Sequence, residues 1–186
     1  MNRVLAFSGS NSSNSINQAL VKYSATLVDA EIVEVIDLRE FDTPIFGVDL
    51  EQEIGSPESI QKLYAKFVEA DGFLISLPEH NSMMPTFFKN LLDWLSRVDR
   101  KFFQGKPIVL LSTSPGPNGG KWALQHFAGL LPRFGGVLKA QLSLGKFGEI
   151  FDRELEKVVD ESALKLLKTT VEALSKENEA VSPEIG

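Results

Sequence analysis

The chain has 186 residues and 43% of them are hydrophobic, which is enough for one globular domain with a sizeable core. Its formal net charge of −6 disfavours a nucleic-acid binder, which usually carries a basic stripe. The lack of cysteine excludes disulfides, thiolate catalysis and cysteine-based metal sites.

Short apolar runs alternate with amphipathic stretches along the chain. The runs predict five strands, at residues 4–7, 32–36, 73–77, 108–111 and 137–144. Most of the first four are almost continuously apolar, as expected for strands covered on both faces. Apolar residues at helical spacing predict helices between them, at residues 16–27, 60–68, 88–95 and 123–134, and a last helix over residues 155–174.

Local signals support these boundaries. Ser56 is predicted as an N-cap with Pro57 in the first turn, and Pro85 stands where another helix can begin. Pro132 is expected to kink or end the helix at 123–134 early, and Gly135 follows its end. Five strand–helix units in series predict an α/β three-layer sandwich with a parallel sheet.

The organisation is that of one domain. We expect it to cover residues 1–176, followed by a flexible tail over residues 177–186, which are mostly polar. No apolar run approaches about 18 residues, and no secretion signal is recognisable. We therefore expect a cytoplasmic protein that binds no membrane.

The segment at residues 8–17 is unusually rich in small polar residues, since nine of the ten are Ser, Asn or Gly. It follows the first strand and leads into a helix, whose N-terminal N–H groups and dipole favour an anion. The loop has no Lys or Arg, which favours a ligand with one phosphate over a triphosphate. The alternative is an ordinary polar turn, because Ser and Asn commonly cap helices.

A second segment follows the third strand, at residues 78–94. In the flavodoxin-type strand order 2-1-3-4-5, strands 1 and 3 are neighbours, and ligands bind beyond their carboxyl ends. The loops at 9–17 and 78–82 would then face each other across one crevice. One loop offers phosphate donors, and the other, braced by Pro78 and Pro85, offers backbone groups, an imidazole and an amide to a planar ring.

At these segments the chain resembles the NADPH-dependent FMN reductase family, which includes quinone, azo-dye and chromate reductases. Residues 9–17 match its pattern Gly-Ser-x-Arg-x-x-Ser-x-Asn, residues 78–81 match Pro-Glu-Tyr-Asn, and residues 88–94 match Leu-Lys-Asn-x-x-Asp-Trp. Phe88 replaces the Leu of the last pattern, and two further differences bear on the site. Ser12 replaces an Arg that the resemblance places at the phosphate, which leaves cofactor affinity and the choice between NADH and NADPH open. His80 replaces a Tyr, either as a packing substitute or as a titrating group.

The resemblance implies a flavodoxin-like fold and an FMN-dependent NAD(P)H oxidoreductase that passes electrons to a quinone-like, azo or other small acceptor. It also implies a homodimer or homotetramer. No side chain is a certain catalytic residue, and His80 is a candidate modulator. The implied FMN-binding residues are Ser10, Ser12, Ser15, Ile16 and Asn17 at the phosphate, and Pro78, Glu79, His80, Asn81 and Ser114 at the ring.

Three other functions remain open. FMN can be a substrate that leaves in its reduced form for a partner enzyme, the protein can be a non-enzymatic flavin electron carrier, or it can be an interaction module that has lost its site.

The loop at 112–122 either flanks the ring, as the resemblance implies, or is a simple turn. His80 and His126 are far apart in the sequence with no matching carboxylates, so we expect no metal site.

A set of apolar residues fits either an interface or a core. Its members are Met83, Met84, Phe87, Phe88, Phe102 and Phe103.

Overall fold

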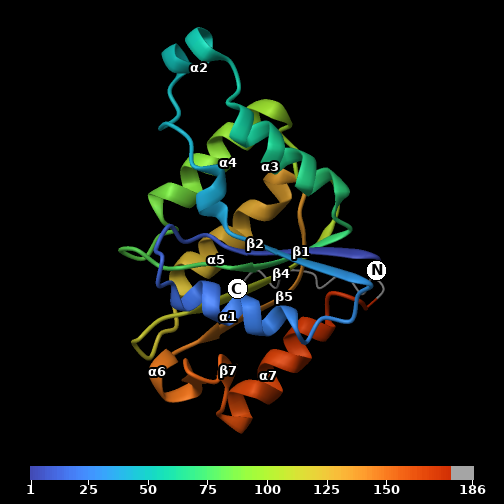
Figure 1. The fold of residues 1–186 in the computed structure, drawn as a ribbon, viewed down its shortest axis with the longest axis vertical. Coiled ribbons are helices and arrows are strands. Elements are labelled where there is room, and N and C mark those ends of the chain that lie inside the picture. Colours follow the sequence, from blue (N-terminus) through green and yellow to red (C-terminus); the bar gives the residue numbers. More distant parts are fainter. Residues whose placement is uncertain (177–186) are drawn as a thin grey trace.

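The computed structural model describes residues 1–176, and the tail expected at 177–186 lies outside these residues. The predicted strands form one parallel sheet in the order β2-β1-β3-β4-β5 (Figure 1), so the prediction of order 2-1-3-4-5 is confirmed. The strands are β1 (Arg3–Ser8), β2 (Ile32–Ile36), β3 (Gly72–Ser76), β4 (Pro107–Thr113) and β5 (Val137–Leu144).

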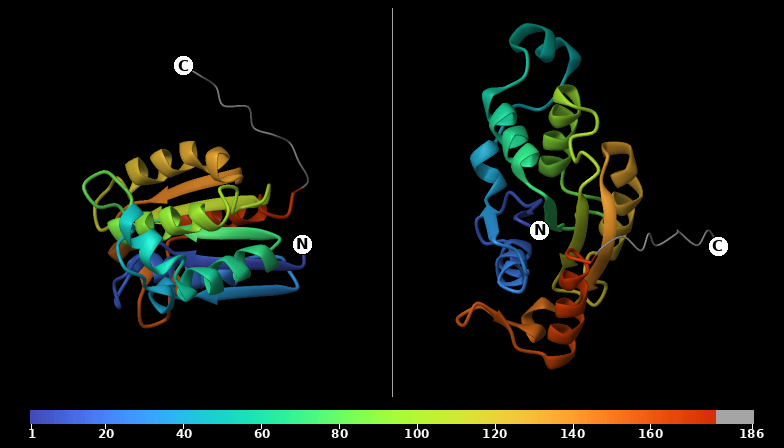
Figure 2. Two further views of the ribbon diagram at one scale, coloured as in Figure 1. Left: turned by 90° about the horizontal axis from the view of Figure 1, so that it is seen from above. Right: turned by 90° about the vertical axis from the view of Figure 1, so that its right-hand side faces the viewer.

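Helices cover both faces of the sheet, as the views in Figure 2 show. One face packs against α1 (Ile16–Ala25) and α7 (Glu161–Glu172). The other packs against α3 (Glu58–Glu69), α4 (Thr86–Val98) and α5 (Lys121–Leu130). Side chains alternate between these two cores along each strand. In β1, Val4 and Ala6 belong to the core under α1, whereas Leu5 and Phe7 belong to the opposite core.

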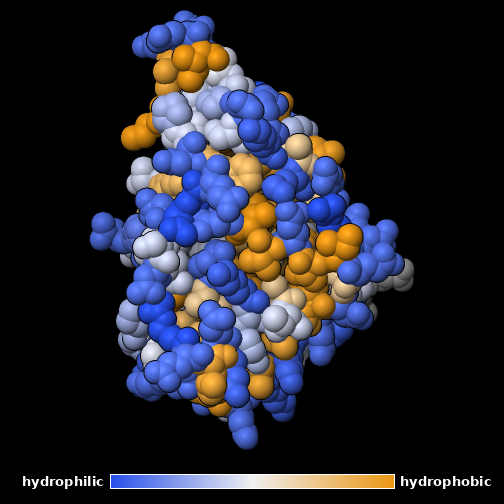
Figure 3. Space-filling view, viewed as in Figure 1, coloured by the Kyte–Doolittle hydropathy of each residue, from blue (hydrophilic) through white to orange (hydrophobic). Residues whose placement is uncertain are grey.

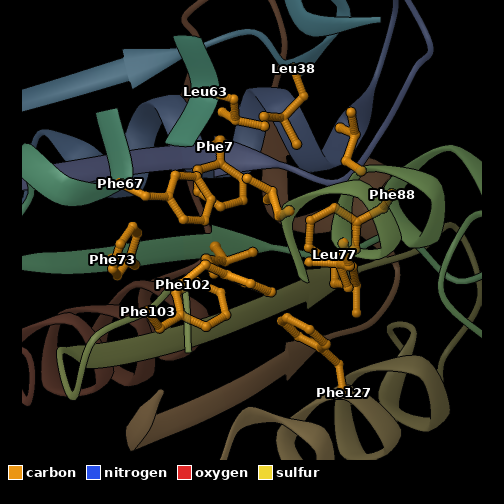
Figure 4. Close-up of a cluster of buried hydrophobic side chains, with 14 of the residues drawn as sticks. Phe7, Leu38, Leu63, Phe67, Phe73, Leu77, Phe88, Phe102, Phe103 and Phe127 are labelled. Atoms are coloured by element: carbon orange, nitrogen blue, oxygen red, sulfur yellow. The ribbon is translucent and has the colours of Figure 1, made fainter. Parts of the chain in front are cut away.

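The larger core is built around phenylalanine rings (Figure 4). Phe67 of α3 stacks on Phe7 with ring centroids 5.6 Å apart and on Phe103 at 5.5 Å. Each such buried side chain contributes about 1.5–3 kcal/mol through the area it removes from water. Phe102 and Phe103 are fully buried here.

Most of the residues that suggested an interface are therefore core residues. Met84 and Phe88 are also buried, and Phe87 is half-buried against the same core. Only Met83 is largely exposed, at 46%. The interface reading of this apolar set is wrong for its buried members, because α4 and the segment after it fold onto the sheet.

The last helix begins later than its apolar spacing predicts. A short helix α6 (Phe147–Ile150) and a hairpin of β6 (Phe151–Asp152) and β7 (Lys157–Val158) precede α7. Asp152 Oδ1 accepts hydrogen bonds from the backbone N–H groups of Glu154 and Leu155, both at 2.9 Å, and so forms the hairpin turn. The predicted helix over 155–160 is wrong, because residues 153–158 form the turn and second strand of this hairpin. Leu155 lies in the turn and is 60% exposed.

The boundary signals at the prolines had mixed outcomes. Helix α5 ends at Leu130 and continues as the 3₁₀ turn η2 (Leu131–Phe134), which confirms the early end at Pro132. Gly135 follows with a φ of 77°, a left-handed conformation that suits glycine. Ser56 does not cap α3, because its hydroxyl is buried without a hydrogen-bond partner and Pro57 occupies the N-cap position.

The segment between β2 and α3 contains two elements that were not predicted. These are the 3₁₀ turn η1 (Leu38–Phe41) and the helix α2 (Val48–Ile54), which projects from the body at the top of Figure 1. Helix α2 has only seven residues and none of them is buried, so its sequence lacks the extended apolar periodicity that predicts a helix. Trp94 of α4 holds the base of this arm by donating from Nε1 to the Pro44 carbonyl oxygen at 2.8 Å. Among the helices of residues 1–176, none has the length and apolar composition to cross a membrane.

Candidate functional site

The loops that follow β1, β3 and β4 emerge at one edge of the sheet, at the left of Figure 1. This edge holds the carboxyl ends of the strands, where open α/β sheets bind ligands. The backbone N–H of Gly9 donates to the Ser76 carbonyl oxygen at 3.0 Å, and that of Leu77 donates to the Leu111 carbonyl oxygen at 2.8 Å. The first loop therefore begins beside the end of β3, from which the second loop leaves.

Asn17 fixes the start of α1 against the neighbouring strands. Its side chain is 3% exposed, and its Oδ1 atom accepts from Ser76 Oγ at 2.8 Å and from the Thr113 N–H at 3.1 Å. Its Nδ2 atom donates to the Thr113 carbonyl oxygen at 3.0 Å. The side chain is thus occupied by the ends of β3 and β4, and any contact of Asn17 with a phosphate has to come from its backbone N–H.

The serine hydroxyls of the first loop are arranged differently. Ser10 Oγ accepts from the Ser12 N–H at 3.2 Å, Ser12 Oγ from the Asn14 N–H at 3.3 Å, and Ser15 Oγ from the Gln18 N–H at 3.1 Å. A hydroxyl that accepts from the backbone still has its own hydrogen to donate. Ser10, Ser12 and Ser15 therefore shape the loop and keep three donors for an anion.

The backbone adds further donors at the same place. Within residues 1–176, the N–H groups of Ser13, Ser15, Ile16 and Asn17 have no hydrogen-bond partner. They stand at the N-terminus of α1, where the helix dipole favours negative charge. Ser8, at the end of β1, has a buried hydroxyl that also lacks a partner. These residues fit a phosphate group chemically, because they offer many donors and few acceptors.

The second loop is a tight turn whose geometry selects its residues. The backbone N–H of His80 donates to the Met83 carbonyl oxygen at 2.8 Å, and the Met83 N–H donates back to His80 at 3.0 Å. Asn81 and Ser82 at the tip have φ values of 50° and 65°, a left-handed conformation that Asn tolerates better than most residues. Pro78 is buried at the base, while His80 and Asn81 are exposed.

Glu79 braces this loop against the third one. Its Oε2 atom accepts from the backbone N–H groups of Trp122 at 2.9 Å and Ala123 at 3.1 Å, in the first turn of α5. The carboxylate so satisfies two N–H groups and interacts favourably with the helix dipole. The Glu79 side chain therefore faces α5, which leaves only the backbone of this residue for a planar ring.

The third loop is held closely by hydrogen bonds from its surroundings. Ser112 Oγ donates to the Gly119 carbonyl oxygen at 2.7 Å, and Ser114 Oγ donates to Gly116 at 3.2 Å. Gly119 has a φ of 62°, and a Cβ atom there would lie 2.5 Å from Ser143 Oγ. Ser114, predicted at the ring, is half-buried in this loop.

Sequence reasoning missed two kinds of residue at this edge. Ser76 and Thr113 hold Asn17 in place, and Arg153 of the β6–β7 turn contacts Asn14. The only signal for Ser76 and Thr113 was their polarity at the ends of two buried strands. Nothing in the sequence near Arg153 points to a residue 139 positions away.

Strand order, helices on both faces and a loop rich in hydrogen-bond donors at the switch point define a flavodoxin-like α/β protein. The model that describes NADPH-dependent FMN reductases matches residues 2–148, so the chain belongs to this family.

Individual relatives agree with this membership. A quinone reductase of Escherichia coli K12 is 32% identical over 123 residues, which span 60% of this chain but only 65% of that protein. An NAD(P)H-dependent FMN reductase of Pseudomonas aeruginosa is 28% identical, with 92% of each chain aligned. Among solved structures, FerB, a flavoenzyme NAD(P)H:(acceptor) oxidoreductase from Paracoccus denitrificans, superposes with a TM-score of 0.79 at 28% identity, covering 94% of this chain and 95% of its own.

The Glu79 brace leads to a prediction about stability. Glu79→Ala removes the acceptor for two N–H groups, so we expect the free energy of unfolding to fall by about 1–2 kcal/mol. Equilibrium urea unfolding followed by tryptophan fluorescence measures the change. Glu53→Ala on the exposed face of α2 is the control and should stay within about 0.5 kcal/mol of the wild type. Equal stability of Glu79→Ala and the wild type would contradict the brace.

Proposed function

We propose that the protein is an FMN-dependent NAD(P)H oxidoreductase that passes electrons to a quinone-like, azo or other small acceptor. The observation that carries the proposal is the donor-rich loop at residues 9–17, which begins beside the end of β3 at the switch point of the sheet. Family membership and the reductase activities in the relatives' names support the same function.

In this proposal the FMN phosphate binds to the first loop. The hydroxyls of Ser10, Ser12 and Ser15 donate to it, together with the backbone N–H groups of Ile16 and Asn17. All of these donors are neutral. Because the phosphate is charged, each hydrogen bond to it contributes more than a hydrogen bond between two neutral groups.

The isoalloxazine ring lies against the second and third loops. The backbone of Pro78 and Glu79, the exposed His80 and Asn81, and Ser114 form its surroundings. Bound FMN supplies the redox chemistry, accepting hydride from NAD(P)H and passing electrons on. The protein's part is to orient the ring and to offer fixed backbone donors, such as the N–H groups of the 78–83 turn, to charge that develops on it.

The first test combines binding and turnover. Protein loaded with FMN and freed of excess flavin should stay yellow, and should oxidise NADH or NADPH faster when a benzoquinone is added. Flavin absorbance measures binding, and the nicotinamide absorbance measures turnover. Boiled protein with the same flavin content is the control for the reaction of free FMN.

Other outcomes favour the alternative functions. Bound FMN without any NADH or NADPH oxidation would contradict the proposal and favour an electron carrier. Turnover that depends on added free FMN, rather than on bound FMN, would favour a flavin reductase that supplies reduced FMN to a partner. If the protein binds no FMN, the interaction module is the alternative that remains.

A second proposal concerns His80 as a modulator of the ring. Its imidazole is exposed, while its backbone makes both hydrogen bonds of the turn, so the side chain can change without loss of the turn. Histidine changes charge near neutral pH. We expect His80→Phe to alter the pH profile of kcat while the free energy of unfolding stays within about 0.5 kcal/mol. Superimposable pH profiles of kcat in variant and wild type would rule out a titrating role.

We also infer a homodimer or homotetramer, as expected for this family. The arm around α2 exposes Ile45 by 76%, Val48 by 61% and Ile54 by 48%. Figure 3 shows hydrophobic residues on this arm and over β2. Exposed apolar groups of this kind commonly mark interfaces. Sedimentation velocity should give a multiple of the 20.5 kDa chain mass, and Val48→Asp should shift the protein towards monomer. A monomeric wild type at micromolar concentration would contradict this inference.

A further inference from the structure

The first loop has no cation of its own, but a cation from elsewhere in the chain contacts it. Arg153 Nη2 donates to Asn14 Oδ1 at 2.5 Å and to the Asn14 carbonyl oxygen at 3.3 Å. Asn14 lies between Ser13 and Ser15, whose N–H groups are among the unpartnered donors at the start of α1. The guanidinium is therefore next to the proposed phosphate position.

The hairpin that carries Arg153 is fixed to the body through Phe151, two residues before it. Phe151 is buried, stacks on Phe147 with ring centroids 4.7 Å apart and meets the Tyr23 ring of α1 edge-on at 6.2 Å. Asp152 closes the turn through its two hydrogen bonds to backbone N–H groups. Arg153 is so placed over the N-terminal end of α1 by packing, rather than by a flexible segment.

The charge of Arg153 is not neutralised by the protein. Among residues 1–176 it forms no ion pair, and its two contacts go to neutral oxygens of Asn14. Arg39 makes the informative contrast. It lines a cavity together with Asn11, but its Nε and Nη2 atoms donate to the Asp37 carboxylate, so its charge is already paired.

Arg153 also has N–H groups that no residue of the described chain uses. A guanidinium has five N–H groups, and the contact with Asn14 uses only Nη2, so Nε and Nη1 have no partner within the described chain. Planar guanidinium groups suit phosphate oxygens, because two parallel N–H groups can bind two oxygens at once.

We propose that Arg153 binds the FMN phosphate. It would supply the positive charge that is missing at position 12, where this chain has Ser and the family has Arg. This inference rests on the proposed function, because it assumes that the first loop holds the FMN phosphate. The charge would come from the C-terminal hairpin, beyond the residues that the family model matches.

The test compares two flavins that differ only in the phosphate. Titrations of the flavin-free protein with FMN and with riboflavin, followed by flavin fluorescence, give the two dissociation constants. Arg153→Gln retains a donor for Asn14 but removes the charge. We expect its FMN dissociation constant to rise by about tenfold or more, and its riboflavin dissociation constant to stay the same. The salt dependence of FMN binding should also become weaker, since one charge pair is lost.

Two further variants sharpen the result. Lys157→Gln removes an exposed charge from the same hairpin and should bind FMN as the wild type does. Ser12→Arg, added to Arg153→Gln, should restore the FMN affinity by returning a guanidinium to the loop. Unfolding temperatures of all variants check that the hairpin is intact.

The outcomes separate the two levels of the argument. If the wild type binds FMN and Arg153→Gln binds it equally tightly, or loses FMN and riboflavin to the same extent, the role of Arg153 is refuted while the proposed function stands. If the wild type binds no FMN, the proposed function itself fails, and the inference fails with it.

Discussion

The amide of Asn17 holds helix α1 against the ends of β3 and β4, and the rest of the site depends on this contact. Its oxygen accepts from Ser76 and Thr113, and its nitrogen donates back to Thr113. A buried amide satisfied in this way is costly to disturb, because each lost partner leaves an unsatisfied polar group. The contact sets where the N–H groups of α1 lie relative to the ends of β3 and β4, and hence the spacing between phosphate and ring in the proposed FMN site.

The contacts that complete the site join residues far apart in the sequence. Glu79 reaches α5 across 43 positions, and Arg153 reaches Asn14 across 139. The local loops supply neutral donors and turns, whereas the charged groups arrive from neighbouring loops and are placed by packing. A carboxylate that caps a helix and a guanidinium without a counter-ion differ in what they do: the first stabilises the protein alone, and the second leaves a positive charge available to an anion.

This division explains what the sequence could predict. The five strands and the polar loops after them followed from apolar runs and from Ser, Asn, Gly and Pro at their ends, which are local signals. The strand order came from the flavodoxin-type topology, which the family resemblance implies and the structure confirms. The helix expected from 155 failed because Leu155, Val158 and Val159 imitate helical spacing within a hairpin. Helix α2 is too short to show an extended apolar periodicity, and the partners of Asn17 leave no pattern in the neighbouring sequence. Family resemblance supplied the ligand expected at the loops, but not the directions in which Glu79 and Asn17 point.

The hydrogen bonds inside the first loop have a thermodynamic consequence. Because Ser10 and Ser12 already accept from N–H groups two residues ahead, the loop is folded before any ligand arrives. Ligand binding then loses little conformational entropy, since few backbone torsions remain to be ordered. An FMN phosphate bound as proposed would therefore gain affinity from the preformed loop without any tighter contact.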